Sequence, residues 1–173
     1  FWFTPSDLKD FGQSLVAVSS FSSNILFWIE SGYFETEAEL KPLLHTWSIA
    51  IEEQFYILYP IFLYFAWRLS FRKTIFALVL IFFISLLLAE WAAYFKPSAN
   101  FYLLPTRGWE LLLGAFTAFY LKYNNFFQNT LLNQTLSILG FGMIVYSIIV
   151  YDSSTPFPSF YALVPTLGTC MLI

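Results

Sequence analysis

The sequence has few charged residues, a single cysteine and no cluster of basic residues. Only 11% of its 173 residues are Asp, Glu, Lys or Arg, whereas about a quarter of a typical soluble domain is charged. Because Cys170 stands alone, the chain can form no internal disulfide. The net charge of −3 and the lack of a basic patch argue against nucleic acid as a partner.

An initiator methionine and a signal-peptide pattern are also missing. The sequence opens with FWFTPSD and ends within an apolar run that is too short to span a membrane. We therefore expect these residues to be an internal piece of a longer chain.

Long apolar runs dominate what is present, since 58% of the residues are hydrophobic. A membrane-spanning helix needs about 20 mostly apolar residues. The runs predict spans at Leu43–Trp67, Thr74–Phe95 and Tyr102–Leu121, and a short but almost wholly apolar span at Leu136–Tyr151. They also predict a weaker span at Phe11–Ile29 and a truncated sixth at Tyr161–Ile173. The predicted fold class is therefore all-α, a polytopic transmembrane helix bundle with about five full spans.

Lysine and arginine follow the predicted loops in alternation. One set of loops holds Lys9, Arg68, Arg72, Lys73 and Lys122, and the opposite set holds Lys41 and Lys96 with Glu30, Glu35, Glu37, Glu39 and Asp152. Because short cytoplasmic loops carry an excess of Lys and Arg, we expect the first set on the cytoplasmic side and the second set outside.

With this orientation, the polar residues of the spans gather between the outer surface and the midplane. His45 lies near the outer end of its span, and Glu52 lies about 10 Å deeper on nearly the same face, because seven residues are close to two helical turns. Tyr56 continues that face, whereas Glu53 is turned by about 100°. The other charged residues of the outer halves are Glu90, Arg107 and Glu110. This placement predicts a polar cavity that opens outward.

Several of these residues also have a structural interpretation. Arg107 and Glu110, three positions apart on one helix, can be a simple ion pair. Glu90 can extend toward the headgroups near Lys96, and His45 can be an interfacial residue without a chemical role.

The Glu52–Glu53 doublet is harder to explain structurally, because two adjacent carboxylates cannot both face lipid cheaply. A carboxylate that faces Arg107 stays ionised and suits the orientation of a histidine or of a substrate hydroxyl. One that faces only apolar neighbours is protonated and suits a proton carrier. The residues alone leave both alternatives open.

Three stretches together resemble the membrane acyltransferase-3 family. Residues 39–60, ELKPLLHTWSIAIEEQFYILYP, closely resemble a signature of that family. Residues 4–28 resemble the segment before the signature, and residues 101–119, FYLLPTRGWELLLGAFTAF, resemble the helix that carries the family's Arg and Glu. Members are integral-membrane O-acyltransferases, typically O-acetyltransferases, that modify O-antigen, peptidoglycan and other envelope or secreted carbohydrates.

The resemblance implies an acyltransferase in a bacterial inner membrane, with several spans. Its donor substrate would be a cytoplasmic acyl-CoA, and its acceptor would be a polysaccharide or a glycolipid. The protein would contact membrane lipid, and it would hold no bound cofactor and no metal. Residues 1–173 would be part of a single transmembrane domain of roughly ten helices. The most similar branch often adds a soluble hydrolase-like domain at the C-terminus.

The resemblance also suggests roles for individual residues. The family's essential histidine and arginine lie on an earlier helix that this sequence lacks, so we expect these residues alone to be inactive. Glu52 and Glu53 would support that histidine, and His45 would assist the acceptor or relay a proton. The expected substrate-binding residues are Arg107, Glu110 and Tyr56.

Two other classes of protein are compatible with the sequence. A secondary transporter would use His45, Glu52 and Glu90 as a proton or substrate path. It would be favoured by inverted repeats and paired Gly/Pro helix breaks, and neither pattern is visible. A purely structural membrane subunit is disfavoured by the number of titratable groups at one depth.

Overall fold

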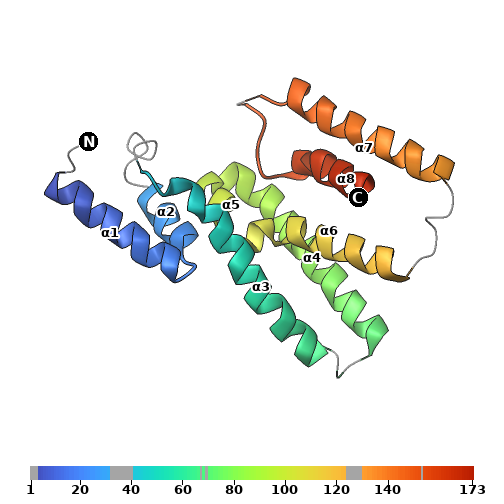
Figure 1. Cartoon of the computed structure of the whole chain (residues 1–173), viewed down its shortest axis with the longest axis horizontal. Helices are drawn as coiled ribbons and strands as arrows, with labels where there is room; N and C mark the ends of the chain where they lie inside the picture. Colours follow the sequence, from blue (N-terminus) through green and yellow to red (C-terminus); the bar gives the residue numbers. More distant parts are fainter. Residues whose placement is uncertain (1–3, 32–40, 67, 69, 124–129, 153) are drawn as a thin grey trace. The chain divides into compact units, whose positions relative to one another are not determined.

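A computed structural model of the chain describes residues 4–31, 41–66, 68, 70–123, 130–152 and 154–173 (Figure 1). Every regular element in these ranges is a helix, which confirms the all-α class. The elements are α1 (Pro5–Ser19), α2 (Ser23–Ser31), η2 (Leu44–Thr46), α3 (Trp47–Ala66), α4 (Phe71–Phe95), α5 (Pro97–Tyr102), α6 (Leu104–Tyr123), α7 (Thr130–Val150), η4 (Phe160–Ala162) and α8 (Leu163–Leu172). Four residues named in the predictions above lie outside the described residues, namely Glu35, Glu37, Glu39 and Trp67.

Three helices in the described part of the chain are long and apolar enough to cross a membrane. They are Leu44–Ala66, Phe71–Phe95 and Thr130–Val150. The 20-residue helix α6 has the length of a span but carries Arg107, Glu110 and Lys122, and it is not among the three. The segment Phe160–Leu172 is a shorter apolar helix.

The single helix expected over Phe11–Ile29 is wrong, because the chain turns between α1 and α2. Phe21 takes a left-handed backbone conformation with φ of 54°. The Ser22 amide donates to the Ala17 carbonyl at 2.8 Å and the Phe21 amide donates to the Val18 carbonyl at 3.1 Å. This pair of bonds is the Schellman pattern that ends a helix.

Contacts divide the chain into two compact units. The first unit is residues 1–74 with 98–104, and the second unit is residues 75–97 with 105–173. In the first unit, α2 packs on α1, η2 and α3. Phe27 of α2 and Ala50 and Ile51 of α3 are buried there, so α2 fixes which side of α3 faces inward.

The core of the second unit forms around Trp109, which is fully buried. Leu86 and Ala89 of α4 and Ala162 of η4 surround it, with Phe82 packed at the edge. The Phe82 and Trp109 rings meet edge to face with centroids 6.3 Å apart. This cluster fixes the first turns of α6 against α4 and against the start of the last helix.

In the second unit, α7 and α8 lie side by side (Figure 1). Gly140 of α7 and Gly168 of α8 face each other at the crossing. A Cβ atom added at Gly140 would lie only 2.5 Å from the Gly168 carbonyl oxygen, and one added at Gly168 would lie 2.7 Å from the Gly140 carbonyl oxygen. The two backbones are therefore close enough that only glycine fits, as is common where helices associate in membranes.

Candidate active site

Arg107 and Glu110 form an ion pair on the first turns of α6. The Arg107 Nη2 atom lies 3.0 Å from Glu110 Oε2 and 3.3 Å from Glu110 Oε1. Only 15% of the Arg107 side chain and 20% of the Glu110 side chain are exposed. The Phe157 ring covers the guanidinium, with its centroid 5.9 Å from Arg107 Cζ. The cation is thus held between a carboxylate and an aromatic face, both of which stabilise it away from water.

Ser85 of α4 fixes the turn of α6 that presents this pair. Its hydroxyl donates to the Pro105 carbonyl at 2.7 Å and accepts from the Trp109 amide at 3.0 Å. These two backbone groups are four residues apart, so the serine bridges one turn of the helix from outside. This contact was not predicted, and its one sequence signal is a serine within an apolar span.

Glu90 of α4 has a structural partner in the same unit. Its Oε2 atom accepts a hydrogen bond from the Phe160 amide at 2.9 Å. Phe160 begins η4, and the first amides of a helix lack partners within the helix. The Glu90 carboxylate therefore caps the start of the last helical segment, a role that the apolar pattern of α4 does not predict.

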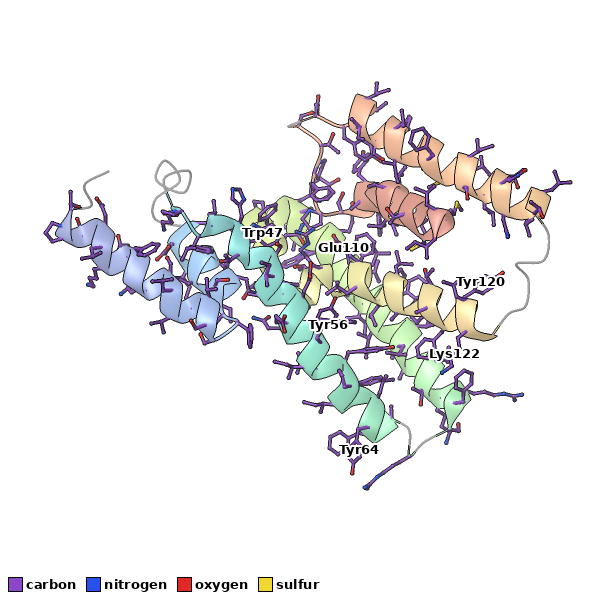
Figure 2. The ribbon with its side chains drawn as sticks, in the orientation of Figure 1. Trp47, Tyr56, Tyr64, Glu110, Tyr120 and Lys122 are labelled. Atoms are coloured by element: carbon purple, nitrogen blue, oxygen red, sulfur yellow. The ribbon has the colours of Figure 1, made fainter. Side chains whose placement is uncertain are left out.

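The remaining predicted site residues lie in the first unit, on η2 and α3. His45 lies on η2, a 3₁₀ turn directly before α3, and therefore not on the α-helix that carries Glu52. The expected common face of His45 and Glu52 stays a prediction. His45, Glu52 and Tyr56 are exposed, and Glu53 is half-buried. Figure 2 shows Tyr56 between Trp47 and Tyr64 along α3.

A partly buried polar network sets the rotation of α3 next to the two glutamates. The Gln54 side-chain nitrogen donates to Asn24 Oδ1 and to the Phe21 carbonyl, both at 2.8 Å. Asn24 Nδ2 donates to the Tyr102 carbonyl at 3.0 Å, and Asn24 is 1% exposed. Because two residues subtend about 200° on a helix, Glu52 points away from the side that Gln54 anchors.

We expect Asn24→Ala to destabilise the protein by about 1–3 kcal/mol, because it leaves the buried Tyr102 carbonyl without its Asn24 donor and removes one of the two acceptors of the Gln54 amide. The measurement is the thermal unfolding midpoint of the detergent-solubilised protein. Gln13→Ala on α1, where the side chain is exposed, is the control and should unfold at the wild-type temperature. Equal midpoints for wild type and Asn24→Ala would contradict the role of the network.

Of the predicted site residues, the structure brings Arg107 and Glu110 into contact. Within the first unit, the side chains of His45, Glu52 and Glu53 form no hydrogen bond or ion pair with one another. No group of three His, Cys, Asp or Glu residues that could hold a metal ion occurs in the described ranges.

One protein family and several known proteins match this chain. The sequence profile of a family described as an acyltransferase domain matches residues 5–173. An uncharacterised protein of Haemophilus influenzae is 29% identical over 99% of this chain and 74% of its own length. The peptidoglycan O-acetyltransferase OatA of Listeria monocytogenes is 32% identical over 71% of this chain. The putative peptidoglycan O-acetyltransferase YrhL of Bacillus subtilis is 29% identical over 72% of this chain.

The matches cover 21% of the length of each of the two named O-acetyltransferases. No solved structure matches this chain.

Proposed function

This chain belongs to the acyltransferase-3 family, and on that basis we propose that it works in the transfer of an acetyl group to a carbohydrate hydroxyl of the cell envelope. The names of the relatives OatA and YrhL support peptidoglycan as the kind of acceptor. Three helices among the described residues are long and apolar enough to span a membrane, which supports a membrane-embedded reaction. The proposed location is a bacterial inner membrane, with several spans.

The proposed reaction exchanges a thioester for an ester. The acceptor hydroxyl oxygen attacks the carbonyl carbon of acetyl-CoA, the carbon–sulfur bond breaks, and the proton of the hydroxyl passes through a general base to the departing CoA thiolate. An oxyanion develops on the acetyl carbonyl oxygen as the new carbon–oxygen bond forms, and fixed positive charge in a site with little water stabilises it strongly.

The observation that carries this proposal is the Arg107–Glu110 pair. Arg107 is mostly shielded from solvent, is oriented by Glu110 and stands on a helix turn fixed by Ser85. We assign Arg107 the stabilisation of the oxyanion or of a polar group of the acceptor, and we assign Glu110 its orientation. Burial of a cation in an apolar helix such as α6 costs free energy, so its presence there points to a function.

The first unit supplies the residues that we assign to proton handling. Glu53 and Glu52 would orient a catalytic histidine and the acceptor hydroxyl, His45 would relay a proton at the outer mouth, and Tyr56 would contact the acceptor. Glu53 is the half-buried member of the doublet, and a carboxylate shielded in this way orients a histidine more strongly than an exposed one.

The transporter alternative needs Glu90 as part of a proton or substrate path. The hydrogen bond from the Phe160 amide gives the Glu90 carboxylate a structural role instead. This contact favours the acyltransferase over the transporter.

The doublet is tested by Glu53→Gln, which keeps the shape of the side chain and removes its charge. We expect base-labile acetate on envelope carbohydrate to fall about a hundredfold, the usual contribution of general acid–base chemistry. The measurement is mass spectrometry of envelope carbohydrate from a host that lacks the activity and expresses each variant.

The matched control is Asp10→Asn on α1, which removes an exposed carboxylate. This variant should acetylate envelope carbohydrate as much as wild type does. Equal acetylation by wild type and Glu53→Gln would make the doublet structural. Absence of acetylation in every strain, at normal protein levels, would reopen the transporter alternative.

A further inference from the structure

The segment of residues 154–160, which we call the cover loop, lies against the Arg107 site within the second unit. It places the Phe157 ring over the guanidinium, at 5.9 Å from Arg107 Cζ. The Phe157 side chain is 47% exposed. One side of the ring therefore packs on the cation while the other side remains open to a bound molecule.

The cover loop is held at its start by a turn around Asp152. The Asp152 Oδ1 atom accepts from the Ser154 amide at 2.9 Å and from the Ser154 hydroxyl at 2.6 Å. The hydrogen bonds from the side chain and then the backbone of Ser154 hold the pKa of the Asp152 carboxyl below its ordinary value. The carboxylate is thus ionised near neutral pH and keeps the turn closed.

The end of the cover loop is held by Glu90. Its Oε2 atom accepts from the Phe160 amide at 2.9 Å. Between Phe157 and Phe160, Pro158 and Ser159 are fully buried, and the Ser159 hydroxyl donates to the Pro156 carbonyl at 2.7 Å. Because this short segment is buried and internally hydrogen-bonded, a shift of Phe160 also moves Phe157, three residues away.

We propose that Phe157 covers Arg107 and determines which acceptor groups reach it, and that Glu90 is the positioning residue that holds Phe157 there. This inference rests on the proposed function, in which Arg107 meets the reacting acetyl group or the acceptor. A group that approaches Arg107 from the side of the cover loop must pass the Phe157 ring, so the size of that side chain limits the acceptor. Glu90 acts at a distance, through the Phe160 amide.

The first test measures the cover without using catalysis. Membranes that contain the protein are treated with phenylglyoxal, which modifies arginine, and the rates at Arg107 and at the exposed Arg72 are followed by mass spectrometry. Phe157→Leu removes the aromatic face, and Glu90→Leu removes the acceptor of the Phe160 amide. We expect both to raise the Arg107 rate about fivefold, the scale of a lost cation–π contact, with no change at Arg72.

Matched variants separate the contact from a general loss of structure. Glu90→Gln keeps a carbonyl oxygen that can accept from the Phe160 amide, so it should label as wild type does. Phe160→Pro removes the amide donor and leaves Glu90 intact. Proline suits this position because Ser159 is extended and Phe160 begins a helical turn. Phe160→Pro should be labelled at Arg107 at the same rate as Glu90→Leu. If Glu90→Leu does not accumulate in the membrane, Phe160→Pro is measured in its place.

The second test uses transfer. We expect Phe157→Leu to raise kcat/KM for a bulky carbohydrate acceptor, relative to that for a small one, about tenfold, the lower end of the effect of a change in pocket size. Glu90→Leu combined with Phe157→Leu should raise this ratio no further than either substitution alone. Unchanged labelling in Phe157→Leu would overturn the cover, and unchanged labelling in both Glu90→Leu and Phe160→Pro would overturn the role of Glu90. If labelling changes as expected but wild type transfers no acetyl group, the proposed function fails while the contact itself stands.

Discussion

Arg107→Lys is expected to lower acetyl transfer about a hundredfold to a thousandfold, the usual cost of removing one group that stabilises a developing oxyanion. Lysine keeps the charge, but its ammonium is a point donor on a flexible stem, whereas the guanidinium is planar and presents several donors in fixed directions. The side chain would also lose the guanidinium that lies over the Phe157 ring. The measurement is the rate of labelled acetyl incorporation into envelope carbohydrate, divided by the amount of protein in the membrane.

A charge swap distinguishes a chemical role for Arg107 from a purely structural ion pair. The double variant Arg107→Glu with Glu110→Arg keeps opposite charges three residues apart on α6. We expect it to accumulate better than Arg107→Glu alone and yet to remain inactive. Arg72→Lys, at an exposed position, is the control and should be fully active. Wild-type transfer by the swapped protein would show that the pair serves the fold alone.

Gly140→Ala is the substitution expected to damage the fold most. Its Cβ atom would lie 2.5 Å from the Gly168 carbonyl oxygen and 3.0 Å from the Met171 Cβ atom, so α7 and α8 would have to separate. Overpacking of this kind costs about 1–3 kcal/mol. The expected result is a lower thermal unfolding midpoint and less protein in the membrane.

The matched control for this substitution lies on the same helix. A Cβ atom at Gly142 meets no heavy atom within 4 Å among the described residues, and alanine is the better helix former by about 0.5–1 kcal/mol. Gly142→Ala should therefore be as stable as wild type or more so. Equal losses in the two variants would mean that helix propensity, and not the contact with Gly168, governs this region.

The apolar runs were enough to predict the long helices, because a span is a local property of about 20 consecutive residues. The predicted spans over Leu43–Trp67, Thr74–Phe95 and Leu136–Tyr151 each overlap an apolar helix, although the last of these helices begins earlier, at Thr130. The break at Phe21 was not predicted, because a left-handed residue that ends a helix is usually glycine or asparagine, and phenylalanine gives no such signal. The 3₁₀ turn at His45 was not predicted either, because its residues carry no sequence signal that distinguishes it from the α-helix that follows.

The site was predictable in part. Spacing alone placed Arg107 and Glu110 in contact, since residues three apart on a helix are neighbours. The partners from distant segments were not predictable in this way: Ser85 bonds α6, and Glu90 bonds the cover loop that carries Phe157. Such contacts depend on how helices pack, which periodicity within one helix does not encode. The roles of His45, Glu52, Glu53 and Tyr56 and the single-domain organisation of residues 1–173 stay predictions.

The most direct test of the central claim is the transfer of label from acetyl-CoA in isolated membranes. Membranes that contain the protein would be supplied with acetyl-CoA labelled in the acetyl group, and envelope carbohydrate would be analysed for base-labile label. We expect labelled acetate in ester linkage to carbohydrate with wild type, and almost none with Arg107→Lys. Equal ester label with wild type, with Arg107→Lys and without the protein would contradict the assignment of this chain to carbohydrate acetylation.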